Sequence, residues 1–189
     1  MPGVDGSSLP FTAALEAAGM VQQAALRPYL VVDEVTRVGD DECWVEARPT
    51  RHSAMSLQYR LDYGSDHVIG RETVRLTLTR SKFLRELAPA RTFLTQEEAE
   101  HLQQQGLAQR VSTQDVLVFG EHGLLDNELR LENECAAHKV LDMVGDLSLA
   151  GCDLIGQFSA HRSGHQLNAA LVQSLLTEFQ VIDDWKVPA

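Results

Sequence analysis

The stretch "HKVLDMVGD", residues 138–146, combines an apolar helical repeat with ionisable groups at regular spacing. The apolar residues of this stretch and its flanks share one arc of a helical wheel: Ala137, Val140, Leu141, Val144 and Leu147. A neighbouring arc carries His138, Asp142 and Asp146, four residues apart, with Lys139 beside them. The first arc predicts a core-facing helix over 132–150, and the second predicts a polar column along the edge of that helix.

This polar column has two interpretations. His138 and Asp142, at i and i+4 on one helix face, can both bind one Zn²⁺, through an imidazole nitrogen and a carboxylate oxygen. Alternatively, the column is a solvated helix face, on which such a pair stabilises the helix by about 0.2–0.5 kcal/mol. The spacing alone leaves both interpretations open.

The composition indicates a globular protein of one domain or two small ones. The chain has 189 residues, 44% of them hydrophobic, and a formal net charge of −11. This charge, without a basic cluster, argues against nucleic-acid binding, which depends on Lys and Arg neutralising phosphates. We expect Cys43, Cys135 and Cys152 to be buried free thiols in a reducing compartment, because their spacing suits neither a disulfide framework nor a cysteine zinc site. The sequence shows no signal-peptide pattern and no membrane-length apolar stretch, so we expect a cytoplasmic location.

The order of elements predicts an α+β fold, in which a mainly antiparallel sheet packs on two long helices. Runs of β-branched and aromatic residues predict strands at 29–35, 43–47, 56–63, 72–78, 115–120 and 153–160, of which the first four are expected to be antiparallel. Periodicity and capping residues predict helices at 7–19, 81–88, 95–106, 132–150 and 164–179. Thr95 and Glu98 form a capping box at the start of the third helix. The end of the sequence, 183–189, is expected to be loose.

Two further stretches carry candidate site residues. In "HRSGHQLN", 161–168, His165 begins a helix, where the positive end of the helix dipole disfavours an imidazolium unless a carboxylate compensates. Asp146 is a candidate for that carboxylate. The other interpretation is a helix-entry loop capped by Ser163, with a histidine at the surface. In "PARTF", 89–93, Thr92 lies between an arginine and a phenylalanine, and this pattern alone indicates no particular chemistry.

Three stretches together resemble a known family: "LAPARTFLTQEEAEHLQQQGL" at 87–107, "HKVLDMVGDLSLAG" at 138–151 and "HRSGHQLNAALVQSLL" at 161–176. In their order and separation they resemble the second domain of UDP-3-O-acyl-N-acetylglucosamine deacetylase, the zinc amidase of lipid A biosynthesis. The resemblance runs from residue 1 to about 180. It implies two similar domains whose helices are sandwiched between two sheets, with the active site between the domains. On this sequence it implies the end of the first domain and an interdomain segment at 1–26, the second domain at 27–180 and a tail at 181–189.

The resemblance also implies roles for six residues. His138 and Asp142 would bind Zn²⁺, and Lys139 would help to hold the substrate and the developing negative charge. Asp146 would orient His165, the general acid for the leaving amine. Thr92 would support the oxyanion formed at the acetamide carbonyl. These roles agree with the chemistry of the residue types, because zinc activates water and polarises a carbonyl, and a histidine held by a carboxylate can protonate an amine.

The sequence departs from the family at the third zinc ligand. In the family this ligand is a histidine of the first domain, preceded by a glutamate that acts as general base, and the chain has no such pair in a helical setting before residue 27. Met1 falls on an interior position of the family, so we expect a fragment, a start codon assigned too late or a truncated gene. Four further histidines are expected at the surface rather than as replacement ligands: His52, His67, His101 and His122. We therefore expect this chain alone to bind zinc weakly and not to deacetylate.

Two functions follow. The chain is part of a zinc-dependent deacetylase acting on an acylated UDP-amino sugar, completed by a first domain or a full-length copy. The alternative is a truncated, non-catalytic relative that binds the nucleotide sugar or regulates a full-length copy. The presence of His138, Lys139, Asp142, Asp146 and His165 together favours the first, because a domain without catalysis has no physical need for charges at a buried edge.

Overall fold

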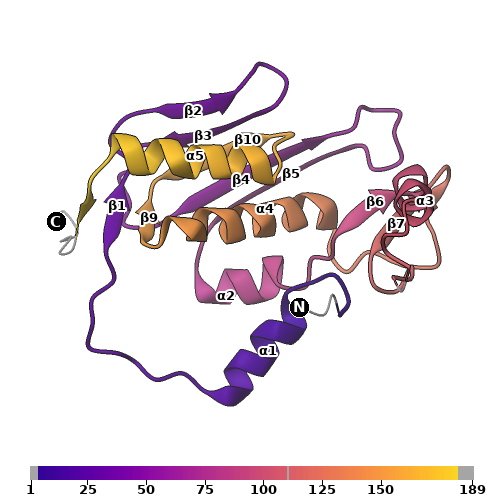
Figure 1. Ribbon diagram of the computed structural model, residues 1–189, viewed down its shortest axis with the longest axis horizontal. Coiled ribbons are helices and arrows are strands. Elements are labelled where there is room, and N and C mark those ends of the chain that lie inside the picture. Colours follow the sequence, from indigo (N-terminus) through magenta and orange to yellow (C-terminus); the bar gives the residue numbers. More distant parts are fainter. Residues whose placement is uncertain (1–3, 110, 183–189) are drawn as a thin grey trace.

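The computed structural model describes residues 4–109 and 111–182, and in these ranges it has five helices and three small sheets (Figure 1). The helices are α1 (Leu9–Ala18), α2 (Arg80–Lys82), α3 (Gln96–Gln104), α4 (Glu134–Leu147) and α5 (His165–Glu178). A π-helical turn, Phe83–Leu87, extends α2, and a 3₁₀ turn, Ser148–Ala150, extends α4. The strands are β1 (Tyr29–Val31), β2 (Thr36–Gly39), β3 (Trp44–Arg48), β4 (Ser56–Asp62), β5 (Arg71–Thr77), β6 (Phe93–Thr95), β7 (Leu117–Gly120), β8 (Gly123–Leu124), β9 (Asp153–Ile155), β10 (Gln157–His161) and β11 (Val181–Ile182). The predicted α+β class is confirmed.

The largest sheet has five strands in the order β2-β3-β10-β4-β5. Its neighbouring strands are antiparallel except β10 and β4, which are parallel. In one row across the sheet, Phe158 lies between Ala47 and Leu57, and all three side chains are buried. In the next row, Arg37 and Arg75 lie on the opposite, exposed face. This alternation gives the sheet one apolar face and one polar face.

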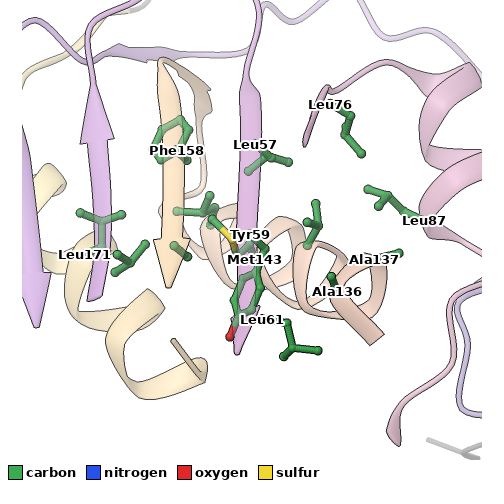
Figure 2. Close-up of a cluster of buried hydrophobic side chains, with 14 of the residues drawn as sticks. Leu57, Tyr59, Leu61, Leu76, Leu87, Ala136, Ala137, Met143, Phe158 and Leu171 are labelled. Atoms are coloured by element: carbon green, nitrogen blue, oxygen red, sulfur yellow. The ribbon is translucent and has the colours of Figure 1, made fainter. Parts of the chain in front are cut away.

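The two longest helices contact the sheet at different strands. Helix α4 contacts β4 and β5, whereas α5 contacts β2 and β3. Their buried residues Met143 and Leu171 belong to the same core cluster as Leu57 and Tyr59 of β4 (Figure 2). A core of this kind is held together mainly by removal of apolar surface from water.

The buried face of α4 is rotated slightly from the one that the helical wheel predicted. Ala136, Val140, Met143 and Leu147 are almost completely buried. Leu141 and Val144, which were expected to face the core, are only half-buried. The helical wheel omitted Met143, which is completely buried and belongs to the same core cluster as Tyr59 and Leu57 (Figure 2).

Two predicted strands were wrong in their extent or their pairing. The run at 29–35 contains only β1, and β1 lies in a separate sheet of order β11-β1-β9, where its pairing with β9 is parallel. The single strand expected at 153–160 is two strands, because the chain changes sheets at Gly156: β9 pairs with β1, and β10 inserts between β3 and β4. The strands at 29–79 are therefore not one antiparallel series.

The third sheet, of order β6-β7-β8, forms a small unit with α3 at one end of the molecule (Figure 1). The Thr95–Glu98 capping box that the sequence predicts is present at the start of α3. Strand β6 was not predicted; it pairs in parallel with β7. Phe93 of β6 and Phe119 of β7 pack edge to face, with ring centroids 6.5 Å apart.

Some expectations concern the chain as a whole. Cys135 and Cys152 are buried free thiols as predicted, but Cys43 is only half-buried. No helix within residues 4–109 and 111–182 is long and apolar enough to cross a membrane. The expected loose end, 183–189, lies outside the described residues. The domain division at residues 26 and 180, and the arrangement of helices between two sheets, stay predictions.

Candidate active site

Helix α4 presents its polar column at the edge of its buried face. Its apolar side packs on the sheet, so His138 and Asp142 come to lie at the rim of the core, with side chains only 13% and 15% exposed. Lys139 and Asp146 are also largely covered. Groups so withdrawn from water interact more strongly than groups on a solvated face. The column is therefore not the solvated face that the spacing alone allowed.

His138 is held as a neutral imidazole with a defined tautomer. Its Nδ1 lies 3.2 Å from the carbonyl oxygen of Ala90, and since a carbonyl only accepts, Nδ1 carries the proton. Nε2 then carries the lone pair, 3.4 Å from Oδ1 of Asp142. Burial lowers the pKa of His138, and the Asp142 carboxylate offsets this only in part.

The pair formed by His138 and Asp142 fits a zinc ion. Tetrahedral zinc holds nitrogen and oxygen ligands at about 2.0–2.2 Å, which places two ligand atoms about 3.4 Å apart. Nε2 of His138 and Oδ1 of Asp142 are separated by that distance, and both are acceptors, so a cation between them would relieve their repulsion. The residues that the structure describes contain no cluster of three or more His, Cys, Asp or Glu side chains able to hold a metal.

Lys139 contacts Asp142, and Thr92 lines the same cleft. The Lys139 ammonium donates to Oδ2 of Asp142 at 2.8 Å, so the carboxylate keeps Oδ1 for another partner. The backbone of Thr92 is fixed on both sides: its N–H donates to the carbonyl of Gly6, and its carbonyl accepts from the N–H of Leu117, each at 2.9 Å. Thr92 itself lines the cleft beside α4.

His165 begins α5 and contacts Asp146 across the gap between the two helices. Its Nδ1 lies 2.8 Å from Oδ2 of Asp146, which is the contact that the charge argument anticipated. The Asp146 side chain is 17% exposed and the imidazole 70%, so a fixed carboxylate holds a ring that remains accessible. With Nδ1 directed at Asp146, Nε2 is free to meet a ligand.

A buried network behind Asp146 was missed by the sequence analysis. The side-chain amide of Asn168 donates to Oδ2 of Asp146 at 2.9 Å, and the hydroxyl of Ser163 donates to Oδ1 of Asn168 at 3.1 Å. Tyr59 donates to the carbonyl of Ser163. Asn168 is only 2% exposed. A polar residue on the otherwise apolar face of the last helix was the available signal, since buried amides are nearly always hydrogen-bonded.

The structure brings these groups to one cleft. Thr92, His138, Lys139, Asp142 and His165 all line it, and its volume is about 1070 Å³. Asp146 lies behind His165, as its contacts show. A histidine–aspartate pair, a lysine and a carboxylate-held histidine thus converge on a space large enough for a sizeable small molecule.

Comparisons with known proteins point to one family. The family model of UDP-3-O-acyl N-acetylglycosamine deacetylase matches residues 1–177. The chain is similar to the UDP-3-O-acyl-N-acetylglucosamine deacetylase of Syntrophus aciditrophicus (strain SB), with 36% identity over 180 residues, which cover 94% of this chain and 56% of the relative. It is 38% identical over 180 residues to the protein of the same name from Anaeromyxobacter sp. (strain Fw109-5), covering 94% and 58%. It is 35% identical over 196 residues to that of Actinobacillus succinogenes, covering 100% and 64%.

The matched residues cover nearly the whole chain but only part of each relative. The chain spans a little more than half the length of the first two relatives. The matched segment includes all six candidate residues, from Thr92 to His165. The chain belongs to the UDP-3-O-acyl N-acetylglycosamine deacetylase family.

Proposed function

We propose that the chain is part of a zinc-dependent deacetylase of lipid A biosynthesis, which hydrolyses the acetamide of UDP-3-O-acyl-N-acetylglucosamine. The substrate comes from the names of the similar curated proteins. The observation that carries the proposal is the placement of two acceptor atoms, Nε2 of His138 and Oδ1 of Asp142, 3.4 Å apart in a cleft that also holds His165.

His138 and Asp142 would hold the metal. A zinc ion bound there would activate water and polarise the acetamide carbonyl. Hydrogen bonds within the chain orient both side chains without a metal. The Ala90 carbonyl fixes the proton on Nδ1 of His138, and Lys139 occupies the second oxygen of Asp142. Such outer contacts orient ligands and reduce the cost of organising the site.

His165 would supply a proton to the leaving amine. Asp146 accepts from Nδ1, and Asn168 fixes the carboxylate from behind, so a proton on Nε2 faces the cleft. The contact with Asp146 holds the ring in a fixed orientation, which a general acid needs. The position of His165 at the first residue of α5 makes this partner necessary, because the helix dipole opposes a positive charge there.

Lys139 and Thr92 would stabilise negative charge in the transition state. The ammonium of Lys139 is partly withdrawn from water, where its field acts more strongly than in bulk solvent. The backbone of Thr92 is hydrogen-bonded on both sides, and its side chain would donate the hydroxyl hydrogen to the oxyanion from this fixed backbone.

We further propose that this chain alone does not complete the site. Its described residues supply two metal ligands, whereas catalytic zinc is normally held by three protein ligands. The third ligand and the base that activates water would come from the part of the enzyme that the relatives have and the matched segment does not include. Zinc affinity of the chain alone should then be weak.

Metal binding tests the ligand assignment. Zn²⁺ affinity of the metal-free chain is measured by competition with a chromophoric chelator, for the wild type, His138→Ala and His122→Ala. His122 is exposed and lies in a turn, so it is the matched control for loss of one histidine. We expect weak binding that His138→Ala removes and His122→Ala leaves unchanged. Equal affinity of the wild type and His138→Ala would refute the assignment.

Acetate release tests the incomplete site. We expect none from the 189-residue chain with UDP-3-O-acyl-N-acetylglucosamine and Zn²⁺. A chimera that joins the chain to the unmatched part of the Syntrophus relative should release acetate, and His138→Ala should abolish this. Zinc-dependent turnover by the chain alone, lost in His138→Ala, would contradict the proposal that the site is incomplete.

A further inference from the structure

One peptide unit connects two side chains of α4. The carbonyl of Ala90 accepts from Nδ1 of His138 at 3.2 Å, and the N–H of the same peptide, that of Arg91, donates to Oε1 of Glu134 at 3.0 Å. Glu134 and His138 are four residues apart, so they lie on one face of α4, one turn from each other. The peptide is trans, and its C=O and N–H point in opposite directions along that face.

The Glu134 carboxylate acts as a hydrogen-bond acceptor in each of its contacts. It is completely buried, and four donors converge on its two oxygens: the N–H of Arg91, Nε and Nη2 of Arg91, and the N–H of Arg130. Burial raises the pKa of Glu134, but these hydrogen bonds outweigh burial and hold the pKa below its usual value. The group is therefore an ionised carboxylate with no proton to offer.

Arg91 is held as firmly as its partner. It is 3% exposed, and the remainder of its guanidinium donates to Oδ1 of Asn127 and to the carbonyl of Glu128. The ion pair thus anchors the segment before Thr92 to the first turn of α4. None of these contacts touches the cleft, so the pair does not act on a ligand directly.

The orientation of the Ala90–Arg91 peptide follows from this carboxylate. A reversed peptide would place its carbonyl oxygen against an ionised, buried Glu134, so that two acceptors would face each other without a hydrogen between them, which is costly inside a protein. The reversed peptide would also present its N–H to Nδ1 of His138. His138 would then carry its proton on Nε2, where the lone pair for a metal is required.

We infer that Glu134 is a positioning residue that sets the tautomer of His138 through the Ala90–Arg91 peptide, keeping the Nε2 lone pair directed at Asp142. The significance of this tautomer rests on the proposed zinc site, but the tautomer itself does not. A purely structural role for the Arg91–Glu134 pair would affect folding stability and leave the tautomer of a folded chain unchanged.

The experiment reads the tautomer directly, without metal and without substrate. The chain is labelled with ¹⁵N-histidine, and long-range ¹H–¹⁵N correlation spectra at pH 8 distinguish a protonated ring nitrogen from one with a lone pair. His138→Ala assigns the signals. Removal of one partner of a buried ion pair can unfold a protein, so the test variant replaces both partners by apolar residues, Arg91→Met with Glu134→Leu. Glu72→Gln is the control, because Glu72 also accepts at the start of α4, from the N–H of Ala136, but does not touch the peptide.

We expect wild-type His138 and the Glu72→Gln variant to show the proton on Nδ1 alone. In the folded double variant we expect this single signature to be lost, with the proton shared between Nδ1 and Nε2. A wild-type His138 protonated on Nε2, or a folded double variant that retains the proton on Nδ1 alone, would overturn the inference.

Zinc affinity separates this inference from the proposed function. If both hold, the double variant should bind Zn²⁺ about 10–100-fold more weakly than the wild type, as is usual for loss of a group behind a ligand. If wild-type affinity equals that of His138→Ala while the tautomer changes as expected, the inference stands and the zinc site fails. A double variant that has an altered His138 tautomer but binds Zn²⁺ as tightly as the wild type would overturn the link between the tautomer and the zinc site.

Discussion

Two carboxylates at the start of α4 show how neighbours decide the state of a buried acid. Glu134 meets four donors, which lower its pKa despite burial. Glu72 of β5 contacts the same helix end. Burial raises the pKa of Glu72, and a single backbone donor, the N–H of Ala136, offsets this only in part. Charge on Glu134 adds to the rise. The folded state therefore favours the ionised form of Glu134 and the neutral form of Glu72.

The raised pKa of Glu72 predicts a pH-dependent effect of Glu72→Gln. Because the folded pKa lies above the unfolded value of about 4.3, the contribution of Glu72 to stability is fully present below that value and is lost as pH rises through the folded pKa. Glutamine mimics the neutral acid and can still accept from Ala136. Urea unfolding should therefore show that Glu72→Gln is more stable than the wild type at pH 7 and equal to it near pH 3.5. Glu121→Gln, at an exposed position, serves as the control and should show no such difference. A Glu72→Gln variant that is less stable than the wild type at pH 7 would contradict this prediction.

Among the elements, Gly156 is the point where one run of chain enters two sheets. The N–H of Val32 donates to the carbonyl of Ile155, and the N–H of Ser56 donates to that of Gly156, at 2.9 and 3.0 Å. Successive residues therefore pair with different strands. A Cβ on Gly156 would meet Cγ2 of Val32 at 3.0 Å and the carbonyl oxygen of Arg48 at 3.2 Å. Val32 and Arg48 thus lie so close to residue 156 that a methyl group there would have to displace them.

This crowding predicts that two glycine-to-alanine changes have opposite effects. Gly156→Ala should lower the free energy of unfolding by about 1–3 kcal/mol, because the methyl group forces two packed neighbours apart. Gly145→Ala, at an exposed position in α4 with open space around it, should raise the free energy of unfolding by about 0.5–1 kcal/mol through helix propensity. Denaturant unfolding of both variants measures the difference. If Gly156→Ala leaves the free energy of unfolding unchanged, β9 and β10 can separate more freely than these contacts indicate.

Local signals explain which elements could be predicted from the sequence. The Thr95–Glu98 capping box and the four-residue column of α4 depend on residues one turn apart, so their sequence spacing is sufficient. Strand order depends on partners far along the chain, and neither the insertion of β10 between β3 and β4 nor the separate sheet of β1 has a local signature. The same limit applies to the site. The contact of His165 with Asp146 could be anticipated from charge, whereas the contacts of the Ala90–Arg91 peptide join segments more than 40 residues apart.

At the scale of the whole molecule, apolar side chains gather on the surface around α1. This helix lies beside α2, to which Glu16 and Arg80 connect it, and residues 19–28 lead from it to β1 (Figure 1). Leu15 and Met20 are 66% and 71% exposed. They border a hollow of about 420 Å³ that is also lined by Leu78 and Phe83. Exposed apolar clusters of this kind mark interaction sites, and we propose that a part of the enzyme outside the matched segment covers this one.

The exposed cluster predicts the solution behaviour of the isolated chain. Because Leu15, Met20, Leu78 and Phe83 leave apolar surface in water, the 189-residue chain should bind a hydrophobic fluorescent dye and self-associate as its concentration rises. Dye fluorescence and sedimentation velocity measure the two effects. Replacing Leu15 and Met20 by glutamine should reduce both, whereas Val35→Gln, which removes an exposed apolar side chain between β1 and β2, should change neither. A compact monomer that binds no dye would show that this surface is stable in water and needs no covering segment.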